Sequence, residues 1–410
     1  MMLSKVLADK LFEAFSIQRW NDRVRPVKLV EMDKHAFKSI LTFLIAEAEE
    51  QRGYTINWDF IVNGTIFSLL KNIVLSDIKS TVIERIENEY EEEYIELNKW
   101  VIEQYRPIID DEAIMDDFSE FLFGKSQSNE RELHILKAAN KYSTKREFDI
   151  IKSANLSFPD INDIEKRLNK ELDEFADIET MYMLINHSSI YTFLCIAEQL
   201  RYQVRWGQSL RIPETSVLGH SMYVATITYF LSRSIKACSQ RVVNNFYAAL
   251  FHDLPESVTR DIISPVKGAT KDFPNTIKAI EQRICENELY PNLSKPTLKR
   301  LKYLLGDLSE FNDEWCNRIV IDGKVIPLKN EATMEINSKY NDDRYNPVDG
   351  VLIKICDEIA AFMEAYKSIE HGIKSIHLSE GCRGIKRHHL SNEDVYDIGL
   401  HNFFLLFNNV

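Results

Sequence analysis

Four polar residues in the second half of the chain have the types and spacing of a metal site. His252 and Asp253 directly follow the apolar run 246–251, whereas His220 and Asp357 each lie on a helical stripe of mostly apolar residues. A buried imidazole or carboxylate costs free energy unless it is paired, hydrogen-bonded or bound to a metal. Two imidazoles and two carboxylates suit one divalent cation such as Zn, Mn, Co, Ni or Fe(II), with coordination positions left for water and substrate.

Two further acids, Glu256 and Asp261, follow the His-Asp pair. Glu256 would share a helical face with His252 if the helix continued, but Pro255 removes a backbone donor and disfavours helix at the preceding residue. We therefore expect the helix to end near Asp253. Glu256 and Asp261 are then predicted to lie on the following turn, at the mouth of the site.

The elements that must position these residues are helical. Apolar residues recur with the helical period in most of the long segments, and the chain has only 13 Gly and 11 Pro among 410 residues. The clearest segments are 35–44, 60–75, 90–105, 190–204 and 221–231. We predict an all-α protein.

One short stretch departs from the helical period. Apolar residues on both sides of Asp322-Gly323, within 317–328, predict a β-hairpin, because Asp-Gly supplies the positive φ of a type I′ turn. The sequence leaves open whether this hairpin decorates the surface or covers the site.

Several blocks of the second half have counterparts in the first half, in the same order. The matched residues are Arg19-Trp20 with Arg205-Trp206, His35 with His220, Asp77 with Asp261, and Asn140 with Asp357, at offsets of 186, 185, 184 and 217. The pattern predicts two copies of one helical domain. We place the first at 1–152, a linker with a helix at 153–180, and the second at 181–410 with an insertion at about 290–350.

The first copy lacks most of the potential metal ligands. In the sequence alignment, Ser68-Leu69 replaces the His-Asp pair and Asn140 replaces Asp357, so only His35 remains. One ligand of four cannot hold a catalytic metal, and this copy is predicted to be inactive. Its Arg19, Trp20, Arg25 and Asp77 admit two explanations, a structural contact or a metal-free nucleotide site.

The order His220, His252-Asp253, Asp357 resembles the HD-domain metal-dependent phosphohydrolases. Additional motifs are similar to the bacterial 5′-deoxynucleotidase branch of that family, over 190–268 and again from about 351. They are Arg205-Trp206, Gly219-His220-Ser221, His252-Asp253-x-x-Glu256, Thr259-x-Asp261 and Pro265-Val266-Lys267. Gly219 departs from the pattern, because the family often has Glu before the metal-binding His.

The resemblance implies roles for individual residues. His220, His252, Asp253 and Asp357 would hold the divalent metal. Glu256 would handle the proton of the attacking water, and Asp261 would lie near the phosphate and sugar. Arg205 and Trp206 would position the phosphate and pack on the deoxyribose, and Lys267 matches a further family residue.

The implied reaction is hydrolysis of a phosphomonoester, with a (deoxy)ribonucleoside 5′-monophosphate as the expected substrate. A nucleoside triphosphate or signalling nucleotide is an alternative, but it would need cations beyond Arg205, Arg211, Arg260 and Lys267. A nucleotide-sensing or scaffolding protein with little catalysis is the alternative from another class.

Composition restricts the partners and the compartment. A net charge of −13 argues against a nucleic-acid polymer as partner, because such polymers bind mainly through Lys and Arg. The chain has no apolar run of membrane-spanning length and no apparent signal peptide. Its six cysteines lack a Cys-x-x-Cys spacing, which favours reduced thiols and a cytoplasmic location. The oligomeric state stays open, a homo-oligomer included.

Overall fold

The computed structural model is built from helices and one β-hairpin, so the all-α prediction is confirmed. It describes residues 3–76, 78–124, 129–260, 262, 266, 270–309 and 311–407. The first half contains α1 (Lys5–Phe12), α2 (Glu31–Gln51), α3 (Trp58–Leu75), α4 (Ser80–Glu89), α5 (Glu91–Tyr105), α6 (Glu112–Leu122), α7 (Glu130–Lys152) and α8 (Ile161–Asp173). The second half contains α9 (Glu179–Ile185), α10 (Ser189–Glu198), α11 (Val217–Ser234), α12 (Ser239–Phe251), α13 (Glu256–Thr259), α15 (Phe273–Ile284), α16 (Lys295–Leu305), β1 (Asn317–Ile321), β2 (Lys324–Leu328), α17 (Glu335–Ser338), α18 (Gly350–Glu370), α19 (Ile376–Ser391) and α20 (Leu400–Leu405).

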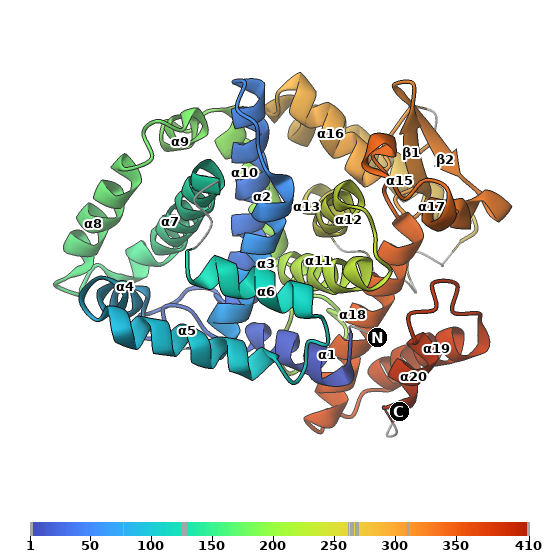
Figure 1. Cartoon of the computed structure of the whole chain (residues 1–410), viewed down its shortest axis with the longest axis horizontal. Helices are drawn as coiled ribbons and strands as arrows, with labels where there is room; N and C mark the ends of the chain where they lie inside the picture. The colour runs from blue at the N-terminus through green and yellow to red at the C-terminus, as the bar shows by residue number, and fades with distance from the viewer. Residues whose placement is uncertain are drawn as a thin grey trace.

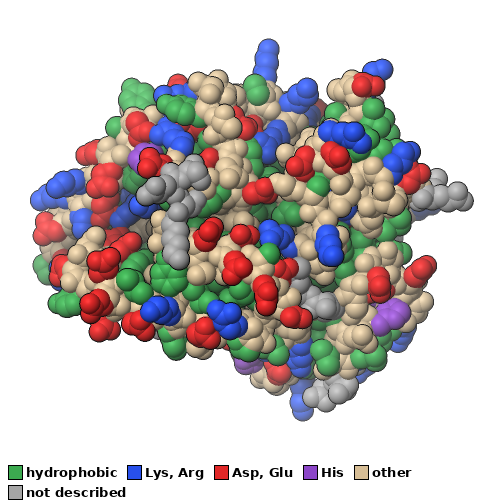
Figure 2. Space-filling model, viewed as in Figure 1, with side chains coloured by type: hydrophobic (Ala, Val, Ile, Leu, Met, Phe, Trp, Pro, Cys, Tyr) green, Lys and Arg blue, Asp and Glu red, His purple; other side chains and the backbone are tan. Residues whose placement is uncertain are grey.

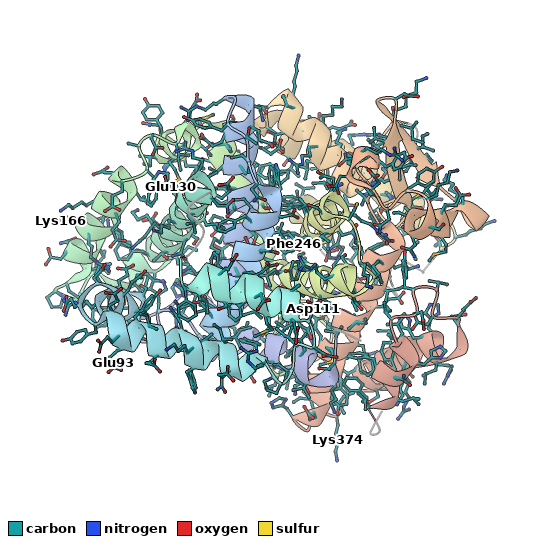
Figure 3. The ribbon with its side chains drawn as sticks, in the orientation of Figure 1. Glu93, Asp111, Glu130, Lys166, Phe246 and Lys374 are labelled. Carbon is teal, nitrogen blue, oxygen red and sulfur yellow. The ribbon has the colours of Figure 1, made fainter. Side chains whose placement is uncertain are left out.

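The two halves share one hydrophobic core. The helices α2 and α11 lie at the centre of the molecule and are buried over most of their lengths (Figure 1). Contacts cross between the halves: the Tyr229 hydroxyl donates to Asn63 Oδ1 at 2.8 Å, and the rings of Phe43 and Tyr247 are 4.9 Å apart. Figure 3 shows Phe246 in this interior, whereas Glu93 and Lys166 lie at the periphery.

The entry into α2 and the entry into α11 have the same local geometry. Trp20 and Trp206 both adopt positive φ, at 52° and 56°. Isolated bridges join Gln18 to Val30 in the first half and Val204 to Ser216 in the second. Every one of these matches has an offset of 186 residues, as do the first residues of α2 and α11.

This offset corrects one pairing made from the sequence. With the helix starts aligned, His220 corresponds to Lys34 and not to His35, which corresponds to Ser221. The side chain of His35 accordingly lies toward Glu31 and Asn72, with its Nε2 3.2 Å and 3.1 Å from their polar atoms. The sequence comparison erred because a one-residue shift preserves the apolar character of a helix that is buried nearly all round.

The helix that carries the His-Asp pair ends as predicted. α12 stops at Phe251, and Glu256 begins the short helix α13 after Pro255. In the first half, α3 instead continues to Leu75 through Ser68 and Leu69. Ser76 and Arg260, at an offset of 184, both have positive φ and end α3 and α13. Asp77, which the sequence alignment pairs with Asp261, lies outside the described residues.

The segment between the predicted copies is not a free linker. Residues 153–180 contain α8, which packs on α7 through a small cluster of Phe148, Ile161 and Leu168.

α3 is the one described helix that is long and apolar enough to cross a membrane, and 56% of it is buried in the core. On the face in Figure 2, acidic and basic side chains are interspersed.

The predicted hairpin forms with its predicted bounds. β1 pairs antiparallel with β2, and Asp322 and Gly323 turn the chain with φ of 50° and 74°. Arg318 anchors it, because its buried guanidinium donates to the carbonyl oxygens of Tyr303 and Leu304 at 2.8 and 2.6 Å. The hairpin lies at the outer edge of the second half (Figure 1).

Gly219 is explained by the packing of the two halves. A Cβ atom at this position would lie 2.5 Å from Asp33 Oδ1 and 2.8 Å from the Phe15 ring. Asp33 also accepts a hydrogen bond at 2.6 Å from Ser216, the residue that caps α11. A larger side chain such as glutamate would collide with the first half of the chain at this position.

We expect Gly219→Ala to lower the free energy of unfolding by about 1–3 kcal/mol, because the added methyl overpacks this contact. Gly384→Ala is the matched control, because Gly384 is also helical and has open space around its Cβ position. The control should be neutral or stabilising by up to about 1 kcal/mol. Urea unfolding measures both, and equal stability of the two variants would contradict the packing explanation.

Candidate metal centre and active site

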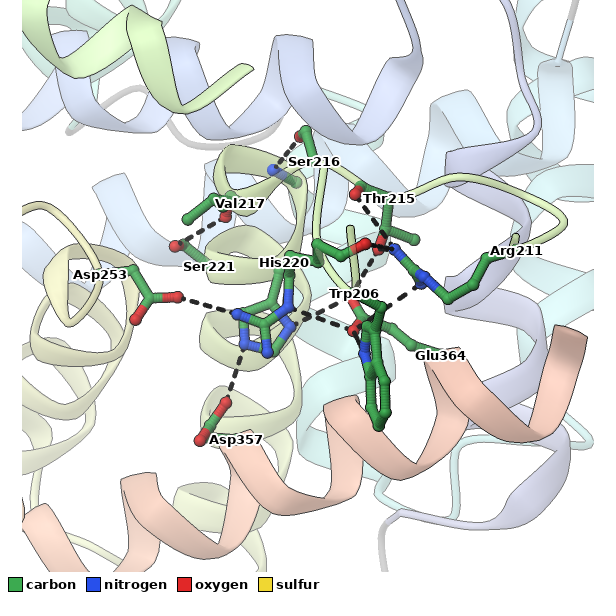
Figure 4. Close-up of polar contacts among 12 residues, drawn as sticks. Trp206, Arg211, Thr215, Ser216, Val217, His220, Ser221, Asp253, Asp357 and Glu364 are labelled. Carbon is green, nitrogen blue, oxygen red and sulfur yellow. Dashed lines mark hydrogen bonds and ion pairs between the residues drawn. The ribbon is translucent and has the colours of Figure 1, made fainter. Parts of the chain in front are cut away.

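Three helices bring the four predicted ligands together. His220 lies on the first turn of α11, which Ser216 caps by accepting from Gly219 N at 2.8 Å. His252 and Asp253 follow the last residue of α12. Asp357 lies two turns into α18 and faces them (Figure 4).

The ligand atoms lie close enough to share one ion. Atoms of His220, His252 and Asp253 lie within 4.8 Å of one another. Asp357 Oδ1 lies 2.8 Å from His220 Nε2 and 3.9 Å from His252 Nε2. His220 is fully buried, whereas 26% of the Asp357 side chain is exposed. The cluster is therefore open to solvent on the Asp357 side.

Both imidazoles are oriented as metal ligands usually are. The Nδ1 atom of His220 lies 3.2 Å from Glu364 Oε1, and that of His252 lies 2.7 Å from the carbonyl oxygen of Ala249. When Nδ1 carries a proton and donates it, Nε2 presents a lone pair. Both Nε2 atoms face the two carboxylates, so this donor set fits one divalent cation.

Glu364 is the residue whose role the sequence did not reveal. Its buried carboxylate accepts from the indole N–H of Trp206 at 3.1 Å, from Arg205 Nε at 3.2 Å and from the Thr215 hydroxyl at 2.8 Å. It also contacts His220 Nδ1. The sequence feature that could have identified Glu364 is its position seven residues after Asp357, on the same inward-facing stripe of α18.

Arg205 lies beside the four predicted ligands. Its NH1 is 3.3 Å from Asp253 Oδ2, and only 15% of its side chain is exposed. The Trp206 ring lies against α19, so close that a Cβ atom at Gly381 would be 2.7 Å from the ring. Arg205 therefore places a positive charge beside the cluster, and Trp206 joins the cluster to α19.

The charges of the cluster stabilise one another. Burial disfavours protonation of His252, but the carboxylates of Asp253 and Asp357 outweigh burial and raise its pKa to about 9. Burial also opposes ionisation of Glu364, but Arg205, His220 and Arg211 lower its pKa. Burial likewise opposes ionisation of Asp253 and Asp357, but the histidines lower their pKa, so these acids are carboxylates at neutral pH. A bound cation would displace the proton that the carboxylates hold on His252.

A cavity of about 240 Å³ adjoins the cluster, and His252 and Glu256 are among its lining residues. Further lining residues lie on α15, at the end of α16 and in the segment before β1. The described acids and cations of its lining are Glu256, Glu281, Asp307, Glu314, Arg260 and Lys278. Trp315 covers His252, with the rings 5.8 Å apart. The strands of the hairpin do not contribute to this lining, and the predicted residues Asp261 and Lys267 lie outside the described residues.

We expect Glu364→Gln to lower kcat/KM about 10- to 100-fold, because the neutral amide holds Arg205 and His220 less firmly. The matched control is Glu370→Gln on the same helix, where 43% of the side chain is exposed. Steady-state kinetics and metal analysis test this role. Equal activity of the two variants would show that Glu364 does not orient the site.

Addition of a divalent metal to chelated protein should raise its unfolding temperature, because a ligand that binds only the folded state adds about 2.7 kcal/mol at 100 times its Kd. We expect His252→Ala to lose this response and the exposed control His377→Ala to keep it. Calorimetric scans with and without chelator measure the shift. An undiminished response in His252→Ala would rule out the cluster as the site of binding.

Comparisons with known proteins agree with this geometry. A family model described as an HD domain matches residues 197–386. A 4′-phosphooxetanocin A phosphatase from Priestia megaterium is 31% identical over 105 residues, which is 25% of this chain and 53% of that protein. The chain thus matches about half the length of this curated relative, and no solved structure matches it significantly. Residues 197–386 of this chain are therefore similar to an HD domain.

Proposed function

We propose that this protein is a metal-dependent phosphomonoesterase acting on (deoxy)ribonucleoside 5′-monophosphates. The observation that carries the proposal is the two-histidine, two-carboxylate cluster beside Arg205, within the residues that match the HD domain. The curated relative is named for a phosphatase activity, which supports the same reaction class.

A bound divalent ion in such a site supplies a water of lowered pKa and positive charge for the phosphoryl oxygens. Arg205 is close enough to Asp253 to add a second positive charge beside the phosphate. Glu256 lines the cavity with His252, a position from which its carboxylate can take the proton of the attacking water. Asp261 and Lys267 keep the roles that the family resemblance implies.

The charge of the cavity favours a monophosphate. Four acids and two cations belong to its described lining, and one of the cations, Lys278, already pairs with Glu314 at 2.7 Å. A triphosphate or a signalling nucleotide would place further negative charge among these acids. The nucleoside part of a monophosphate is neutral, and its hydroxyl and amino groups can donate hydrogen bonds to these carboxylates.

The first half of the chain is proposed to be a second, catalytically silent copy of the same helical unit. Lys34, Ser68 and Asn140 occupy the positions that correspond to His220, His252 and Asp357. The six described cysteines are all free, which supports a cytoplasmic location.

Phosphate release from nucleoside mono-, di- and triphosphates, each with several divalent metals, tests the substrate. We expect the highest kcat/KM for a monophosphate. A preference for triphosphates would favour the alternative substrate, and no turnover by metal-loaded protein would favour a sensing or scaffolding role.

Two variants separate metal binding from proton transfer. Asp253→Asn should lose both the metal and the activity, whereas Glu256→Gln should keep the metal and lower kcat about 10²- to 10⁴-fold. Asp163→Asn is the control, because its side chain is 80% exposed on α8. Full activity of Asp253→Asn would show that Asp253 is not a ligand of a catalytic metal.

A further inference from the structure

Two lysines of α2 are buried without a compensating partner. Lys34 and Lys38 lie one helical turn apart and are only 4% and 3% exposed. Among the described residues, neither ammonium group makes a hydrogen bond or an ion pair. Other buried cations of this protein are compensated: Arg241 pairs with Asp349, and Arg318 donates to four backbone carbonyls.

The acids near these lysines already bind other groups. Glu147 Oε2 accepts from Arg19 at 2.7 Å and from Trp20 at 3.1 Å, and its Oε1 faces the buried Arg201 at 3.6 Å. Glu31 pairs with Arg19 at 2.8 Å and accepts from Asn72 at 2.6 Å. Neither carboxylate lies within ion-pair distance of Lys34 or Lys38.

The nearby carboxylates compensate these lysines only in part. Burial and the neighbouring Arg19 lower the pKa of Lys34 to about 8, although Glu31 and Glu147 act in the opposite direction. Burial lowers that of Lys38 to about 7, with Lys34 as the next cause. A large part of their positive charge nevertheless remains at neutral pH, and an isolated buried charge is costly.

The position of the lysines shows what could compensate them. Lys34 corresponds to the metal ligand His220 of the second half, and Glu147 corresponds to Glu364. Both carboxylates hold an Arg-Trp pair, so the surroundings of the metal centre are reproduced around Lys34. In the second half the positive charge beside a bound phosphate would be that of a metal ion. In the first half, Lys34 stands at the position of one predicted ligand, and Lys38 lies one turn further along the same helix.

We propose that Lys34 and Lys38 form a metal-free anion site, which binds the phosphate group of inorganic phosphate or of a phosphate monoester. Lysine suits this role, because its ammonium group is a compact donor of three hydrogen bonds to phosphate oxygens. Among the described residues, the one cluster of potential metal ligands includes neither lysine, so the site would hold the phosphate without hydrolysing it. The proposal is independent of the substrate of the second half.

The test uses full-length protein carrying Asp253→Asn, in chelator, so that the metal centre does not bind the probe. Calorimetric titration with inorganic phosphate and with deoxyadenosine 5′-monophosphate should each give one site per chain. We expect Lys34→Met/Lys38→Met to weaken binding at least tenfold and the exposed control Lys99→Met to leave it unchanged. Tighter binding of the nucleotide identifies a nucleotide ligand, and equal binding identifies free phosphate.

Thermal unfolding provides a second measurement. Methionine keeps the apolar stem and removes the charge, so Lys38→Met should unfold at a higher temperature than the parent in anion-free buffer. Saturating phosphate should raise the unfolding temperature of the parent more than that of Lys38→Met. Absence of phosphate binding in the parent, or equal affinity in parent and double variant, would overturn the proposal.

Discussion

The buried carboxylate of Glu364 is the interaction on which the candidate site depends. It joins α18 to α11 through His220 and to the preceding loop through Arg205, Trp206 and Thr215. A buried carboxylate is tolerated only when its oxygen atoms are fully hydrogen-bonded or paired with positive charge. Satisfying this one group therefore determines where the histidine, the arginine and the tryptophan lie relative to Asp357.

The same constraint operates around Glu147 but leads to a different site. Glu147 holds Arg19 and Trp20 as Glu364 holds Arg205 and Trp206, so the local backbone of the two halves is alike. The residues enclosed by this framework differ in charge. Imidazoles and carboxylates in the second half suit a cation, whereas Lys34 and Lys38 in the first half suit an anion. The same local framework thus encloses different charged groups in the two halves.

The close contact of the halves adds its own restrictions. Asp33 of α2 leaves no space for a side chain at position 219, and burial raises the pKa of Asp33 to about 6. The segment from α15 to Trp315 borders the cavity beside His252, where the Trp315 ring lies near the His252 ring and several acids line the cavity. The charge of this cavity is therefore set by that segment as much as by the predicted ligand cluster.

The local sequence was sufficient to predict the helices, the end of α12 before Pro255 and the hairpin at Asp322-Gly323. Apolar periodicity, the effect of proline and the preferences of turn residues all act over a few neighbouring residues. It also singled out His220, His252, Asp253 and Asp357 as candidate ligands, since polar residues on apolar stripes are conspicuous, and the structure brings the four together. Only the tertiary structure decided which partners these residues have. It paired Lys34 with the position of His220, gave Glu364 its four contacts and placed Asp33 against Gly219. These relations join residues more than a hundred positions apart, and a helix buried on all sides carries no periodic signal that would set its register in advance.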